Sequence, residues 1–180
     1  MWEVEFQATG GQLGPELAAQ VQELLTTDDP DRAGDLVVLI EAAVAPVSGG
    51  LSVDVVAVLT CVVAGLPWMR TETRPEALLL LTQIAGSAEA DDKAVAASAR
   101  SALAAALPLF GKIAEIGSDD EVAQSIDLMS MCSSLSEEST RRAVYFLERI
   151  VADAEGAIKA SAQLELDEIM RGSRSDGQSG

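Results

Sequence analysis

The chain of 180 residues contains no histidine and no asparagine, and aromatic residues make up only 3% of it. The missing imidazole excludes Ser-His-Asp and Cys-His nucleophile systems, and every metal site that needs a histidine ligand. The two cysteines, Cys61 and Cys132, lie far apart in the sequence, which excludes a thiolate metal cluster as well. We therefore expect neither a metal centre nor a catalytic triad.

Motifs that bind phosphate or calcium are also missing. No GxxxxGK[ST] loop occurs, and the pairs Gly10-Gly11 and Gly49-Gly50 lack the flanking strand that a phosphate-binding loop requires. Asp28, Asp29 and Asp31 have neither the ligand spacing nor the distal glutamate of an EF-hand. The sequence predicts no cofactor, no metal ion and no enzymatic activity.

Positive charge is scarce, since the chain has 12 Lys and Arg residues against 29 Asp and Glu residues, which gives a net charge of −17. Such a surface repels the phosphates of nucleic acids and the headgroups of anionic membranes. It attracts a basic protein and accelerates the encounter. A second interpretation is that the charge only keeps an aliphatic-rich chain in solution. We expect no nucleic-acid or membrane partner.

Long apolar runs are absent too. The longest uncharged stretch, residues 55–69, falls short of the roughly 18 apolar residues that suggest a membrane span. The first residues, MWEVEFQATGG, lack the basic and apolar regions of a signal peptide, so we expect a cytoplasmic protein. Cys61 and Cys132 each lie in an apolar helical run and should be buried thiols. A disulfide between them would need a secreted context.

What the chain has in abundance is helical periodicity. Apolar residues recur at helical spacing along almost its whole length, and strand alternation is almost absent; only 2–7 suggests a short extended segment. The helix expected at 75–86 is apolar on all sides and should therefore be central. Pro108 should end or kink the Ala-rich helix over 91–107. Three pairs have capping-box spacing and predict helix starts: Thr73 with Glu76, Ser118 with Glu121, and Ser134 with Glu137.

Two stretches carry a family resemblance. DDPDRAGDLVVLIEAA, residues 28–43, resembles a helix-joining turn of the HEAT-like repeats of bacterial solenoid proteins, and RPEALLLLTQIAGSAEADDKAVAASARSALAAAL, residues 74–107, is similar in rhythm. The resemblance implies an all-α fold of stacked antiparallel helical hairpins, a HEAT-like α-solenoid, that serves as a binding scaffold. We expect one helical domain over 1–171 and a disordered tail over 172–180, which has no apolar residue.

The acidic turn at 28–31 is interpreted as a corner between two helices and not as a binding site. Asp28 or Asp29 can cap the second helix, and Pro30 suits a first helical turn because its φ is fixed. Other acidic candidates have similar structural explanations. Asp54 lies among valines and can be a helix cap, and Glu165 with Glu168 forms a helical i,i+3 pair that solvent normally covers. The basic pair Arg141-Arg142 can form ion pairs with neighbouring acidic residues or bind an acidic partner.

One segment favours a binding role. GLPWMRTETR, residues 65–74, places Trp68, Met69, Arg70 and Arg74 in a predicted loop after Pro67. Tryptophan and arginine are frequent anchors of protein interfaces, so these four residues are the predicted partner-binding set. The alternative is that Trp68 folds back over the helix ends.

The sequence thus favours a non-enzymatic protein-binding module with an acidic surface. An immunity-type inhibitor of a basic partner is one concrete version. A helical subunit of a larger assembly, a small-molecule pocket protein and a carboxylate-dependent enzyme remain alternatives, and a homo-oligomer stays open.

Overall fold

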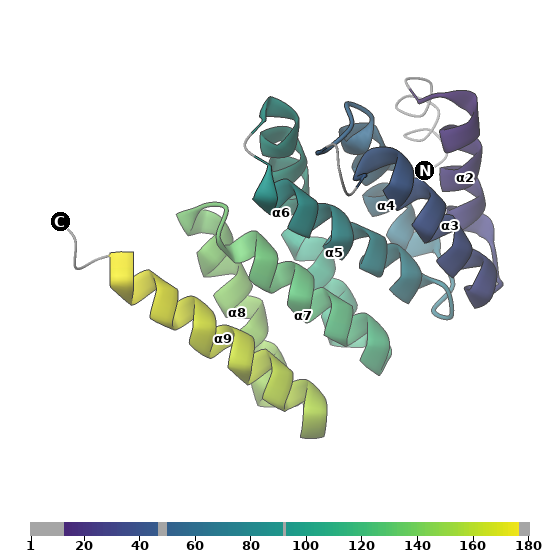
Figure 1. Ribbon diagram of the computed structural model, residues 1–180. Helices are drawn as coiled ribbons and strands as arrows, with labels where there is room; N and C mark the ends of the chain where they lie inside the picture. Colours follow the sequence, from purple (N-terminus) through teal and green to yellow (C-terminus); the bar gives the residue numbers. More distant parts are fainter. Residues whose placement is uncertain (1–12, 47–49, 92, 177–180) are drawn as a thin grey trace. The chain divides into compact units, whose positions relative to one another are not determined.

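The chain is entirely helical where its structure is described. A computed structural model describes residues 13–46, 50–91 and 93–176, and no strand occurs in these ranges, which confirms the all-α prediction (Figure 1). The extended segment expected at 2–7 lies outside the described residues. The elements are α2 (Pro15–Thr26), α3 (Pro30–Val44), α4 (Val55–Gly65), the 3-10 helix η1 (Leu66–Trp68), α5 (Arg74–Ala90), α6 (Ala94–Ile116), α7 (Asp119–Ser133), α8 (Glu137–Asp153) and α9 (Gly156–Asp176).

These helices divide into two compact units, Met1–Leu103 and Ala104–Gly180, and α6 contributes residues to both. The single domain expected over 1–171 stays a prediction. Helix α9 continues to Asp176 and so includes the first residues of the predicted tail. The last four residues of that tail lie outside the described residues.

In the first unit, α3 packs against α2 and α5, and α4 packs against α2, η1 and α5. Aliphatic side chains fill the contacts, because each helix turns its apolar stripe inward. Helix α5 is buried on several sides, as its all-round apolar sequence predicts, through Leu78, Leu80, Leu81 and Ile84. The core of this unit is therefore built from leucine, valine, isoleucine and alanine, with almost no aromatic contribution.

The acidic turn forms the corner between α2 and α3. Asp29 is the N-cap of α3, and its Oδ1 accepts hydrogen bonds from the backbone N–H groups of Asp31 (3.0 Å) and Arg32 (3.3 Å). The guanidinium of Arg32 then reaches back to α2, where Nε and Nη2 donate to the two carboxylate oxygens of Glu23 at 2.7 and 2.8 Å. The hydrogen bond from Arg32 lowers the pKa of Glu23. Capping by Asp29 and the adjacent Arg32–Glu23 pair give this corner a structural role.

Asp29→Ala should lower the free energy of unfolding by about 0.5–2 kcal/mol, because two helical N–H groups lose their acceptor. Asp28→Ala is the matched control and should have a smaller effect, since no side-chain hydrogen bond of Asp28 occurs in the described structure. Urea unfolding followed by circular dichroism measures both variants. Equal losses in the two variants would contradict the capping role of Asp29.

In the second unit, α7, α8 and α9 pack against one another, and α9 runs alongside the other two (Figure 1). The predicted capping box of α7 is confirmed: Ser118 Oγ accepts from the N–H of Glu121, and Glu121 Oε2 accepts from the N–H of Ser118. The other two pairs do not form capping boxes. Helix α8 is capped by Ser136, two residues after Ser134. Thr73 is the N-cap residue of α5, as its spacing predicts, but its hydroxyl donates to the carbonyls of Thr27 and Arg70 and forms no capping bond with the helix.

Pro108 lies inside α6 and does not end it. Proline removes one backbone donor, but the flanking residues Leu107 and Phe110 are fully buried, and their burial holds the helix together across that gap. Of the two outcomes expected at Pro108, a helix end or a kink, the helix end does not occur.

Helix α6 is also the one helix in the described ranges that is long and apolar enough to cross a membrane, judged by length and composition. In this fold, 39% of its most apolar 18-residue window is buried. Its Arg100 donates to the backbone carbonyls of Ala88 and Asp91. Length and composition are weak indications, because helices in the core of a folded protein pass the same test.

Both cysteines are free and buried, as predicted, and burial raises the pKa of Cys132 to about 12. Because the thiolate is the reactive form, Cys132 should resist thiol reagents at neutral pH. We expect a maleimide to label neither cysteine in the native protein and both after denaturation, measured by intact-mass spectrometry. Rapid labelling of Cys132 in the native protein would contradict its place in the core.

Candidate functional site

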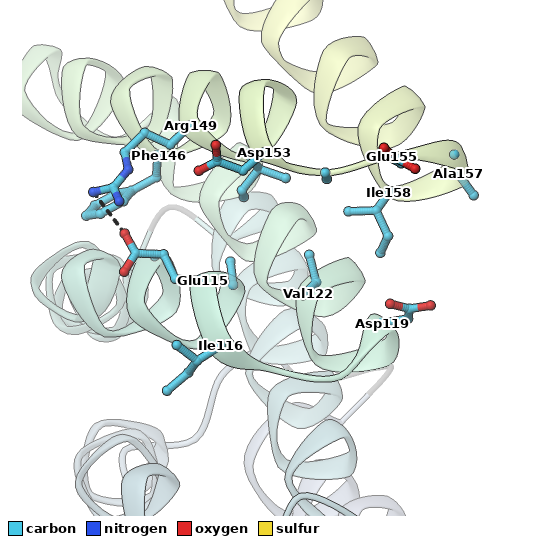
Figure 2. A pocket seen from close by; sticks show the side chains of 15 residues that line it. Glu115, Ile116, Asp119, Val122, Phe146, Arg149, Asp153, Glu155, Ala157 and Ile158 are labelled. Carbon is cyan, nitrogen blue, oxygen red and sulfur yellow. Dashed lines mark ion pairs between the residues drawn. The ribbon is translucent and has the colours of Figure 1, made fainter.

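The second unit contains a cavity of about 870 Å³ where four helix ends meet. The end of α6 and the start of α7 form one side of it, and the end of α8 and the start of α9 form the other (Figure 2). Two helix–helix turns therefore face the same space. The sequence makes the second turn sharp, because Gly156 adopts a positive φ of 59° that other residues rarely accept.

The base of the cavity is apolar. Among its apolar lining residues, we call the following five the cavity floor: Ala114, Val122, Phe146, Ile150 and Ile158. Gly111 of α6 makes room for the ring of Phe146, because a Cβ at that position would overlap the ring. At the edge of the floor lies Ile116, which is 70% exposed although it is a large apolar side chain. Apolar surface is thus offered to solvent inside a concave site.

The cavity opening is acidic. We call its four carboxylates the acidic rim: Glu115, Asp119, Asp153 and Glu155. The only cation in the lining is Arg149, so four carboxylates against one guanidinium leave an excess of three negative charges. In Figure 2, Glu115 and Arg149 lie together at one end, Asp119 and Glu155 lie toward the other end, and Asp153 lies between them.

The two ends differ in electrostatic balance. Glu115 Oε1 pairs with Arg149 Nη1 at 2.9 Å, and Glu115 Oε2 lies 3.4 Å from Lys112 Nζ. Arg149 also donates to the Tyr145 hydroxyl at 3.2 Å, and this bond and the charge of Glu115 raise the pKa of Arg149. Asp119 and Glu155 form no ion pair in the described structure, and Asp153 reaches Arg149 only as a longer-range charge. The negative charge of the cavity is therefore concentrated away from Arg149.

Helix dipoles explain only part of this rim. Asp119 is the first residue of α7, where a negative charge is favourable. Glu115 and Asp153 instead lie in the last turns of α6 and α8, where the dipole favours cations. Glu115 is compensated by Arg149 and Lys112, but Asp153 has no such close partner in the described structure. The α8 dipole therefore gives no reason for a carboxylate at position 153.

The partner-binding residues predicted from sequence lie in the first unit, and none of them lines this cavity. Trp68 ends η1 with 60% of its surface exposed, and Arg70 is exposed beside it. Met69 is buried in the core. Arg74 donates from Nε to the carbonyl of Leu66 (2.9 Å) and from Nη2 to that of Met69 (2.7 Å), so it closes the end of η1. Their predicted binding role stays a prediction, with Trp68 and Arg70 as its accessible members.

Trp68→Ala should change the melting temperature little, because an exposed side chain contributes within about 0.5 kcal/mol to stability. Met69→Ala, one residue away, should cost about 2–5 kcal/mol through the cavity it leaves in the core. Thermal unfolding of the two variants measures the contrast. A large loss in Trp68→Ala would instead support the alternative that Trp68 covers the helix ends.

The other sequence candidates are dispersed. Asp54 precedes α4 and accepts from the Ser52 hydroxyl at 3.4 Å, without a side-chain cap bond to the helix. Glu165 of α9 accepts a hydrogen bond from Ser130 of α7. Burial and the charge of Glu165 raise the pKa of the nearby Asp127, yet neither carboxylate lines a described cavity. This pair therefore offers no enclosed place for acid–base chemistry on a substrate.

The basic pair lies at a second, shallower cavity of about 420 Å³. Arg141 and Arg142 line it with Tyr145 and Phe146, and Arg142 pairs with Glu138 on the same helix. Phe146 lines both cavities, so the acidic site and this more basic surface are adjacent.

Within the described ranges, no group of three or more Asp, Glu or Cys side chains is placed to hold a metal ion. The acidic rim therefore presents separate carboxylates and not a chelating set. Comparison with known proteins found no relative: the chain matches no family model, no curated protein and no solved structure.

Proposed function

We propose that this chain is a non-enzymatic binding module that recognises a basic protein through the acid-rimmed cavity of α6–α9. The observation that carries the proposal is a cavity that joins an apolar floor, with the exposed Ile116 at its edge, to a carboxylate rim with a net excess of three negative charges. Apolar contact supplies affinity, and the surrounding charge selects and steers a cationic partner. The net charge of −17 on the whole chain acts in the same direction at longer range.

We further propose that the helices form a HEAT-like array. This is supported by the packing pairs within each unit, which join α2 to α3 and α4, α3 to α5, and α7, α8 and α9 to one another. Each partner is a neighbour or next neighbour in sequence, as in solenoids where repeats contact only adjacent repeats. A scaffold of this kind presents helix ends and turns along its edges, and the cavity is formed by two such turns.

The acidic charge and the lack of catalytic groupings fit an immunity-type inhibitor that covers a basic partner. Two buried free thiols suit a reducing compartment such as the cytoplasm. A second candidate function is favoured by the cavity volume alone: about 870 Å³ lies within the range of small-molecule sites, so a small organic cation would fit.

The test is affinity capture from extract of the native cell with the immobilised full chain at low salt, followed by elution with rising salt. We expect a basic protein to elute, and the isolated pair to form a stoichiometric complex in analytical size exclusion. The affinity of that complex should fall as salt rises, because charge attraction contributes to it. A captured protein without excess positive charge, or a salt-independent affinity, would overturn the proposal.

A further inference from the structure

We infer that the occupant of the acidic cavity is a short partner segment that carries a large apolar side chain next to lysines or arginines. The apolar side chain contacts the cavity floor, and the cationic side chains reach Asp119, Asp153 and Glu155. This inference rests on the proposed function, because it takes the partner to be a basic protein, and it adds where and how that protein is held.

The floor argues for an apolar anchor. Phe146, Ile150 and Ile158 come from α8 and α9, and Val122 approaches from α7, so an inserted side chain would be contacted from several helices. Ile116 at the edge is 70% exposed, and covering it removes apolar surface from water. A purely ionic ligand would leave this surface uncovered.

The rim argues for cations at one end. Asp153 lies at the unfavourable end of the α8 dipole, and its nearest compensation is the charge of Arg149 at longer range. Asp119 and Glu155 have no ion pair in the described part of the chain. A bound cation would relieve this concentration of charge, whereas the end at Glu115 is already neutralised by Arg149 and Lys112. The segment therefore bears its positive charge beside the anchor on one side only.

Charge also excludes other occupants. Phosphates of nucleic acids and anionic lipid headgroups are repelled by the rim. A second copy of this chain carries a net charge of −17 and is repelled in the same way. A basic protein segment meets both the floor and the rim.

The probes for the test are fluorescently labelled synthetic peptides, read by anisotropy against the full chain at low salt. The first peptide alternates leucine and lysine, the second replaces each lysine by glutamate, and the third replaces each leucine by serine. We expect the leucine–lysine peptide to bind at least about tenfold more tightly than either control, a difference of about 1.4 kcal/mol. An alkylammonium salt is added as a competitor that has the same chemistry without a peptide.

Two matched sets of variants locate the site. Asp119→Asn, Asp153→Asn and Glu155→Gln combined should weaken the leucine–lysine peptide at least about tenfold. The control combines Glu137→Gln, Glu148→Gln and Glu168→Gln, which are exposed, lie in the same unit, do not line the cavity and change the net charge equally. Ile116→Ser should weaken binding severalfold, while Leu164→Ser, also an exposed apolar residue, should not.

Arg149→Gln tests for a gain in peptide affinity, a result that misfolding cannot produce. It removes the one cation of the lining and releases Glu115, so the leucine–lysine peptide should bind more tightly than to the wild type. Circular dichroism checks that every variant keeps its helix content.

The results separate the two proposals. Equal weakening by the rim and control sets, or weaker binding by Arg149→Gln, overturns the inference about the cavity, while capture of a basic protein would still support the proposed function. Tighter binding of the alkylammonium salt than of the peptide also overturns the inference, in favour of a small cation. Peptide binding in the cavity without capture of any basic protein would instead contradict the proposed function.

Discussion

The structure depends on close helix packing around a core that has almost no aromatic side chains. Short aliphatic side chains fill space only if the helices approach one another, and small residues at the contacts permit this. Gly65 of α4 lies against Leu25 of α2, and Gly111 of α6 lies against Phe146 of α8; a Cβ at either glycine would overlap its neighbour. At Gly111 this constraint also shapes the candidate site, because it positions the one aromatic ring of the cavity floor.

Much of the fold follows from local sequence. Apolar stripes at helical spacing predict the helices, and Ser118 with Glu121 predicts the start of α7, because these signals act over a few neighbouring residues. Predictions were wrong where tertiary burial competes with a local signal. Pro108 fails to end α6 between the buried Leu107 and Phe110, and Ser136 caps α8 although Ser134 has the better spacing to a glutamate.

The candidate site was much harder to predict. Its lining residues extend over 111–158, and no two of its charged groups form a recognisable motif. Residues 65–74 stood out in the sequence because they combine a tryptophan with two arginines. Their side chains lie in different environments: Trp68 is exposed, Met69 is buried and Arg74 binds backbone carbonyls. Composition alone does not distinguish a side chain that faces solvent from one that stabilises a helix end.

The positions of the carboxylates along the helices nevertheless contained a usable signal for the candidate site. Many acidic groups of the described residues stand at helix starts, as in Asp29, Asp31 and the Asp119–Glu121 run, where capping and the dipole explain them. Glu115 and Asp153, like Glu23, Glu41 and Glu89, occur in the last turns of their helices, where the dipole opposes them. In a protein with a net charge of −17 the number of acidic residues says little, but their placement against the helix dipole separates charges that stabilise helices from charges that need another explanation. Of these residues, Glu115 and Asp153 line the same cavity, and the cavity carries the functional proposal because its carboxylates lie beside an apolar floor.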